Sequence, residues 1–247
     1  MAAFNMEIAG AVGRIDALFE TTAVYFKNYL TRRPADFSFA PTPEDLRREQ
    51  EWLDAEAQEE GLRRRAFTEP FLERAVIQRA FADHLFYRDT LLLHGSTVAV
   101  DGAAYLFTAP CGTGKSTHTR LWRQIFGARA VMINDDKPFL AIREDGVTAY
   151  GTPWSGKHGL DTNMAAPLKG ICILSRGAEN RIRPLAAEDG LEFLIRQCHC
   201  PETPDAKIQL RDLVSRLTDA VPLWQMECNR DTEAARVAYE AMKQAGD

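Results

Sequence analysis

Residues 109–117 read Ala-Pro-Cys-Gly-Thr-Gly-Lys-Ser-Thr, and no other run constrains the fold of this chain as strongly. The run matches the pattern G-x-x-x-x-G-K-[ST], except that Ala109 stands in place of the first glycine. Gly112 and Gly114 permit backbone angles that a side chain disfavours, so successive N–H groups can point toward one anion. The run therefore predicts a phosphate-binding loop between a strand and the N-terminus of a helix.

The residues of this loop divide into side-chain and backbone contributors. Lys115 is expected to reach the outer phosphates of a nucleoside triphosphate, and the Ser116 hydroxyl is expected to bind Mg²⁺. The other predicted nucleotide-binding residues belong to the same run: Gly112, Thr113, Gly114 and Thr117. The alternative is a glycine-rich turn that precedes a helix by chance, and the flanking sequence argues against it.

Both flanks of the loop fit the prediction. Ala103–Thr108 is a mostly apolar, β-prone run, and Thr117–Phe126 has apolar residues at helical spacing. Asp101-Gly102 separates the first run from another β-prone stretch, residues 91–100, and an Asp-Gly pair in this setting predicts a hairpin. The strand before the loop should thus have an antiparallel neighbour, unlike the strand of a usual βαβ nucleotide-binding unit.

A pair of carboxylates follows the next apolar strand. The chain reads Ala130-Val131-Met132-Ile133-Asn134-Asp135-Asp136. A strand that ends in carboxylates is where a phosphoryl-transfer site holds a ligand of Mg²⁺. The second carboxylate can accept the proton of an attacking hydroxyl. The alternative is an exposed Asp-Asp turn without a chemical role.

With His94-Gly95 and the hairpin, these motifs resemble the HPr kinase/phosphorylase and phosphoenolpyruvate carboxykinase superfamily over about residues 91–185. The closer likeness is to small HPr-kinase-related bacterial proteins, through "LLLHGSTVAVDGAAYLFTAPCGTGKSTHTRLW", "VMINDDKP" and "GTPWSGKHGLDTN". The resemblance implies an α/β fold, with a P-loop kinase core whose mixed sheet is flanked by helices.

The resemblance also implies roles for matching residues. Asp136 would bind the metal with Ser116, and Asp135 would be the catalytic base, although the opposite division stays open. His94 matches the histidine that lies near the transferred phosphate in HPr kinase. The Gly-rich signature of the phosphorolytic reaction and the full set of carboxykinase substrate residues are not found, so neither of those activities is expected.

The segment Gly151–Gly159 is predicted to be a lid or acceptor loop, because glycine-rich loops on a rigid sheet often carry function. Lys157 is expected to stabilise charge on the transferred phosphoryl group. His158 is expected to bind the acceptor or product phosphate, and Trp154 to form a wall of the acceptor site. The alternative is an ordinary connection with a packed tryptophan.

We predict two domains, an N-terminal α+β extension over residues 1–88 and the P-loop core over residues 89–247. The expected elements of the extension are a strand and three helices: strand 6–12 and helices 22–30, 42–60 and one from residue 68. The apolar face of the last helix is expected to pack on the core sheet, with a dimer contact as the alternative. Further along, the pattern predicts a hairpin of strands 139–142 and 147–150, strands 170–174 and 181–184 joined by a turn at Gly177, a strand at 221–227, and helices at 187–197, 206–217 and 232–244. Arg176 and Arg181 fit either the nucleotide site or the surface.

Composition limits the partners. Net charge is −5, and the densest basic run is Arg63-Arg64-Arg65, so a nucleic-acid partner is not expected. No stretch approaches the ~20 apolar residues of a membrane span, and residues 1–19 lack the apolar core of a secretory signal. The five cysteines do not suggest a disulfide framework, so a cytoplasmic location is expected. Cys198-His199-Cys200 with Cys228 invites a zinc interpretation, but ordinary thiols are favoured.

The leading hypothesis is an ATP- and Mg²⁺-dependent kinase whose acceptor is a hydroxyl of a small molecule or of a serine in a peptide or protein. The alternative is a nucleotide-binding regulatory module with slow ATPase activity and a protein partner. A homo-oligomer remains possible under either hypothesis.

Overall fold

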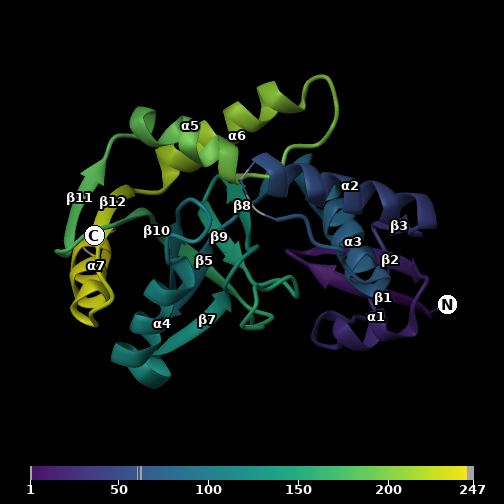
Figure 1. The fold of residues 1–247 in the computed structure, drawn as a ribbon, viewed down its shortest axis with the longest axis horizontal. Helices are drawn as coiled ribbons and strands as arrows, with labels where there is room; N and C mark the ends of the chain where they lie inside the picture. The colour runs from purple at the N-terminus through teal and green to yellow at the C-terminus, as the bar shows by residue number, and fades with distance from the viewer. Residues whose placement is uncertain (1, 60, 62, 244–247) are drawn as a thin grey trace. The chain divides into compact units, whose positions relative to one another are not determined.

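The computed structural model describes residues 2–59, 61 and 63–243. The chain divides into two compact units, Met1–Leu85 and Phe86–Asp247, and each unit has its own sheet (Figure 1). Among the described residues, no helix has both the length and the apolar character needed to cross a membrane.

The first unit is built on a three-stranded sheet of order β1-β2-β3. Its elements are β1 (Ala2–Ile8), β2 (Ala11–Ala17), α1 (Glu20–Tyr25), η1 (Lys27–Tyr29), β3 (Phe37–Phe39), α2 (Pro43–Glu59) and α3 (Glu69–Phe86). The single strand predicted over 6–12 is wrong, because β1 and β2 form an antiparallel hairpin that turns at Ala9-Gly10. Both turn residues have positive φ, 49° and 83°. Ala-Gly is a weaker hairpin signal than Asn-Gly or Asp-Gly, which explains the error.

The start of α2 follows from local chemistry. Asp45 N donates to Thr42 Oγ1 at 3.2 Å, and Thr42 N donates to Asp45 Oδ2 at 2.9 Å. This reciprocal capping satisfies backbone donors at the start of α2, as the sequence predicts.

Most of the apolar face of α3 packs within the first unit, while Phe86 at its end belongs to the core cluster of the second unit. Leu72 and Val76 cluster with Leu46 of α2, and the Phe81 ring lies 5.0 Å from the Phe37 ring of β3, centroid to centroid. For these residues the expected packing on the core sheet is wrong, because the first unit has a sheet of its own that the sequence analysis did not anticipate.

The second unit contains a mixed sheet of nine strands. Seven of them follow the order β4-β8-β9-β10-β6-β5-β7, while β12 pairs with β10 and β11. The strands are β4 (Thr90–Leu92), β5 (Ser96–Val100), β6 (Ala103–Thr108), β7 (Ala130–Asn134), β8 (Phe139–Arg143), β9 (Gly146–Tyr150), β10 (Ala165–Arg176), β11 (Arg181–Leu185) and β12 (Leu223–Cys228). The described part of the chain is thus an α/β protein with a mixed sheet and flanking helices, as expected at this level.

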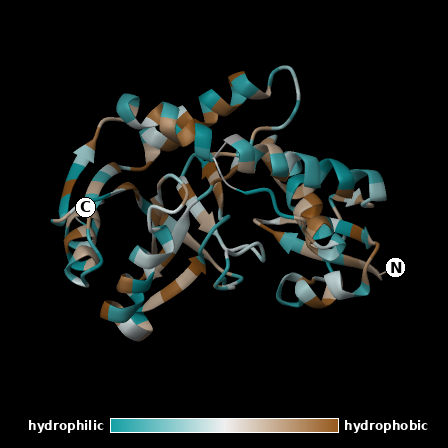
Figure 2. Ribbon diagram, viewed as in Figure 1, coloured by the Kyte–Doolittle hydropathy of each residue, from teal (hydrophilic) through white to brown (hydrophobic). Residues whose placement is uncertain are grey.

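Helices cover this sheet from two sides. They are α4 (Lys115–Phe126), η2 (Gly127–Arg129), α5 (Ala187–Gln197), α6 (Ala206–Ala220) and α7 (Glu233–Lys243). Residues of β6 alternate between two apolar clusters: Tyr105 and Phe107 pack with α4 and α7, while Leu106 packs with α5 and α6. These helices carry both hydrophobic and hydrophilic residues (Figure 2), as expected where one face meets a sheet.

The local hairpins of this unit are as predicted, but one long-range pairing is not. Asp101 and Gly102 have φ of 51° and 82°, and β5 pairs antiparallel with β6 across them. The predicted turn near Gly177 does not join two paired strands, because β12 lies between β10 and β11 and pairs with both.

Candidate functional site

The 109–117 loop joins β6 to α4, in the predicted order of strand, loop and helix. Gly112 has φ of 73° and Gly114 has φ of 125°, values that only glycine adopts without strain. Ala109 is buried and is not among the residues with positive φ, so alanine serves at the place of the first glycine. No side chain caps the N-terminus of α4 at Gly114, which leaves its first-turn N–H groups facing the loop.

Two cationic side chains hold the loop. The buried Lys115 donates from Nζ to Ala109 O at 3.0 Å. Arg176, at the end of β10, donates from Nη2 to Gly112 O at 2.5 Å and from Nε to Thr113 O at 3.3 Å. From the sequence alone, Arg176 and Arg181 fit either this site or the surface. The structure brings Arg176 to the loop, whereas Arg181 pairs with Glu179.

The remaining loop residues lie where a ligand can reach them. Thr113, Ser116 and Thr117 are partly exposed, and Gly112 is exposed. The Ser116 hydroxyl makes no hydrogen bond within the described part of the chain, so it is available to a ligand.

His94 and Asp136 form a pair beside the loop. His94 follows β4 and Asp136 follows β7, and Gly95 N donates to Asp136 O at 2.9 Å. His94 Nε2 lies 3.3 Å from Asp136 Oδ1. Burial lowers the pKa of His94, the charges of Lys137 and Lys115 lower it further, and the contact with Asp136 offsets only part of this. We therefore assign a neutral imidazole at neutral pH.

Asp136 is ionised. Burial alone would raise its pKa, but the hydrogen bond with His94 and the charges of Lys137 and Lys115 outweigh burial, and the pKa lies below its ordinary value. The Thr108 hydroxyl, at the end of β6, donates to His94 O at 2.9 Å, and the charge of Lys115 lowers the pKa of both members of this pair, so the loop and the pair are neighbours.

The pKa of Asp135 is shifted in the opposite direction from that of Asp136, above its ordinary value. Burial raises its pKa, the neighbouring charge of Asp136 adds to the rise, and the Gly156 N–H and His158 oppose it. Asp135 Oδ1 accepts from Gly156 N at 2.6 Å, while the buried Oδ2 has no hydrogen-bond partner among the described residues. A buried carboxylate oxygen without a donor is costly, and such an exception calls for a functional explanation.

Asn134 is a residue of the site that the sequence analysis missed. Its Oδ1 accepts from Asp136 N at 2.7 Å and from Lys137 N at 2.6 Å. Its Nδ2 donates to Thr152 O at 2.8 Å, to Thr152 Oγ1 at 2.9 Å and to Trp154 O at 3.3 Å. The available sequence signal was its position, because a polar residue ends an apolar strand directly before the two aspartates.

The Gly151–Gly159 loop meets the Asp pair at Gly156, and its tip points outward. Lys157 and His158 are exposed, and no hydrogen bond or ion pair joins Lys157 to the described residues. Trp154 is buried, with 7% of its surface exposed, so it packs in the interior instead of lining an acceptor site. Ser155 Oγ donates to Asp161 Oδ2 at 3.0 Å and joins the two sides of the loop.

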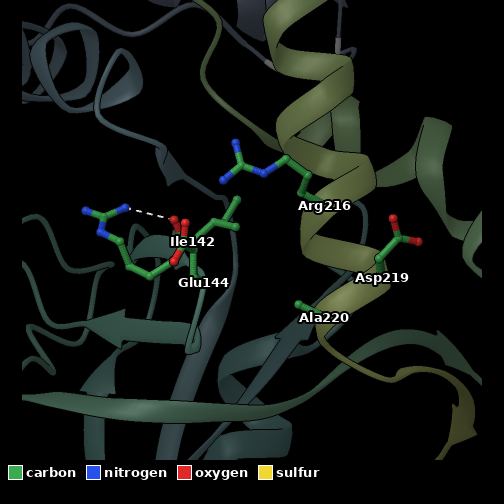
Figure 3. A pocket seen from close by; sticks show the side chains of 6 residues that line it. Ile142, Glu144, Arg216, Asp219 and Ala220 are labelled. Atoms are coloured by element: carbon green, nitrogen blue, oxygen red, sulfur yellow. Dashed lines mark hydrogen bonds between the residues drawn. The ribbon is translucent and has the colours of Figure 1, made fainter.

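Other candidate sites are weaker. Among the described residues, no group of three or more His, Cys, Asp or Glu side chains is arranged to hold a metal ion. Burial raises the pKa of the Cys198 thiol to about 12, which disfavours the thiolate that zinc requires. A cavity of about 360 Å³ lies between the β8–β9 hairpin and the end of α6, lined by Arg143, Glu144 and Arg216 among others (Figure 3). Its arginines already contact Asp89, and it is remote in sequence from the loop.

Comparison with known proteins adds little to this picture. No protein-family model matches the chain, and no curated protein matches it. Among solved structures, the HPr(Ser) kinase/phosphatase from Coxiella burnetii is a distant structural neighbour, with a TM-score of 0.37 and 7% sequence identity. The match covers 62% of this chain and 97% of that chain. A likeness at this level decides neither family nor activity, so the function is argued from the residues of the site.

Proposed function

We propose that the second unit transfers the γ-phosphoryl group of ATP to a hydroxyl group, with Mg²⁺ as cofactor. The observation that carries the proposal is the meeting of three features in one place. These are the glycine-shaped 109–117 loop with Lys115, the ionised Asp136 beside a neutral His94, and the buried Asp135 with a raised pKa.

The electrostatics support a division of labour between the two aspartates. Asp136 is ionised and partly exposed, with a third of its side-chain surface accessible, and so suits a metal ligand together with the Ser116 hydroxyl. Asp135 binds a proton more readily than an ordinary aspartate and suits the base that accepts the hydroxyl proton.

The other predicted residues take supporting roles in this proposal. The N–H groups of Gly112, Gly114 and Thr117 would hold the phosphates, and Lys115 would leave Ala109 O to neutralise the outer ones. Thr113 N donates to Pro110 O at 3.2 Å, so its N–H would join them only after leaving that carbonyl. His94 would lie beside the transferred group. Lys157, at the exposed loop tip, would reach the site only after that tip moves inward.

A magnesium nucleotide fits these residues. Mg²⁺ needs only one or two protein carboxylates when phosphate oxygens and water complete its shell. The lack of a three-ligand cluster among the described residues is therefore compatible with a metal that arrives with its nucleotide. When bound, Mg²⁺ would neutralise charge on the phosphates, and most of the rate would come from positioning.

The test is to incubate the protein with MgATP and a metabolite and peptide extract, and to search by mass spectrometry for compounds that gain a phosphate. The matched control is Asp135→Asn, which keeps an acceptor for the Gly156 N–H and removes the base. We expect transfer with wild-type protein and loss of transfer with the variant. Transfer at the wild-type rate by Asp135→Asn would rule out Asp135 as the base.

One observation favours a second function, a nucleotide-binding regulatory module with slow ATPase activity. Asp135 has only 3% of its surface exposed, and a side chain on Gly156 would lie 3.4–3.5 Å from its carboxylate oxygens. Gly156 covers the Asp135 carboxylate in this position, so an acceptor hydroxyl would reach the base only after the 151–159 loop moves. Nucleotide binding and slow hydrolysis that no added metabolite or peptide accelerates would support this function over transfer.

A further inference from the structure

We propose that Asn134 is a positioning residue that sets both aspartates of the site from one buried point. The inference rests on the proposed function, because it explains how the metal ligand and the base are held. Asn134 ends β7 and is fully buried, with 0% of its surface exposed.

The surroundings of Asn134 match the donor and acceptor of a carboxamide. Its oxygen faces two backbone N–H donors, and its nitrogen faces two backbone carbonyls and the Thr152 hydroxyl. The orientation of the amide is therefore fixed by groups that cannot exchange roles. A leucine here would leave two backbone N–H groups unpaired, and an ionised aspartate would oppose two carbonyl oxygens.

The two sides of this amide act on different parts of the site. Through Oδ1 it holds the backbone N–H of Asp136, whose carboxylate contacts His94. Through Nδ2 it holds Thr152 and Trp154 at the start of the loop from which Gly156 reaches Asp135. Thr152 completes the link, since its hydroxyl donates to Lys137 O at 2.8 Å. One side chain thus fixes the turn that carries both aspartates and the loop that covers one of them.

The 109–117 loop does not depend on Asn134. Its contacts are made by Lys115 and Arg176, which lie on α4 and β10. Loss of the Asn134 amide should therefore disturb the metal ligand and the base while metal-free nucleotide still binds. The variable to follow is the gain in nucleotide affinity that Mg²⁺ produces.

The experiment compares ATP affinity with and without Mg²⁺ by calorimetry for wild-type protein, Asn134→Leu and Asn134→Asp. The matched control is Thr97→Val. Thr97 lies opposite Asn134 in the β5–β7 register, and its buried hydroxyl has no hydrogen-bond partner. We expect Asn134→Leu to lose most of the Mg²⁺-dependent gain, by about tenfold or more, with metal-free affinity within about threefold. Thr97→Val should retain the full gain.

Asn134→Asp separates the two sides of the amide. Its carboxylate keeps an acceptor for the Asp136 and Lys137 N–H groups and loses the donor to Thr152 O and Trp154 O. It should therefore retain more of the Mg²⁺-dependent gain than Asn134→Leu, whereas a purely structural role would lower metal-free and Mg²⁺-dependent binding together.

The outcomes separate the two proposals. If wild-type protein binds no nucleotide, the proposed function is wrong and Asn134 has no site to organise. If wild type shows the Mg²⁺-dependent gain and both Asn134 variants keep it, the function stands and the positioning role is refuted.

Discussion

A buried histidine makes the stability of the second unit sensitive to acid. His118, in the first part of α4, has 2% of its surface exposed. Its Nε2 accepts from Trp122 Nε1 at 3.1 Å, and its ring centroid lies 4.5 Å from that of Phe107. Its Nδ1 has no hydrogen-bond partner in the part of the chain that the structure describes. Burial lowers the pKa of His118 from 6.5 to about 3. The folded chain therefore holds this imidazole neutral.

The sign and size of the effect follow by linkage. Below pH 6.5 the unfolded chain binds a proton at His118 that the folded chain refuses until the pH approaches 3. Stability from this residue is complete above pH 6.5 and falls by about 1.4 kcal/mol for each pH unit below it. Between pH 6.5 and about pH 5 the loss is about 2 kcal/mol, a large part of the stability of an ordinary domain.

The test is His118→Gln, which can keep an acceptor for the Trp122 N–H and does not titrate. Urea unfolding would be followed by tryptophan fluorescence at several pH values; Trp52 alone lies in the first unit, so the signal reports mainly the second. The variant should lose stability with acid less steeply than wild type, by about 1.4 kcal/mol per pH unit. The exposed His158→Gln is the control and should keep the wild-type slope. Equal slopes for wild type and His118→Gln would refute the reasoning.

Further predictions concern the site itself. At neutral pH, Asp135→Asn should raise the melting temperature and Asp136→Asn should lower it, because the pKa of Asp135 is raised and that of Asp136 is lowered; thermal melts with shifts of the same sign would contradict this. Arg176→Gln should weaken MgATP binding by about tenfold, since the loop loses its donor to Gly112 O. Unchanged affinity by calorimetry would show that the Arg176 contact does not support nucleotide binding. Gly112→Ala should destabilise the second unit by about 1 kcal/mol in urea unfolding, because φ of 73° strains a residue with a Cβ, and an equally stable variant would oppose this.

Features coded by neighbouring residues could be predicted from the sequence. The β5–β6 hairpin follows from Asp101-Gly102, and the start of α2 follows from the Thr42 cap. The order of β6, the 109–117 loop and α4 was likewise predictable from a short motif. In each case the deciding interactions join residues within a few positions of one another.

Features that depend on strand pairing could not be predicted. Ile173 of β10 lies opposite Thr108 of β6 in a parallel register, and this brings Arg176, three residues later, beside the loop that follows β6. No sequence pattern near Arg176 predicts that contact. The position of β12 between β10 and β11 depends on a segment about fifty residues away, so a local turn signal at Gly177 misled the prediction. Asn134 was missed because its partners, Thr152 and Trp154, come from a loop that only the fold places beside it.

The central claim is that the 109–117 loop binds the phosphates of a nucleotide and that Lys115 carries their charge. The most direct measurement is a calorimetric titration of the wild-type chain and of Lys115→Ala with MgATP. We predict saturable binding by wild type and no measurable binding by the variant, with the variant as folded as wild type by circular dichroism. Equal affinity of the two proteins for MgATP would contradict the account.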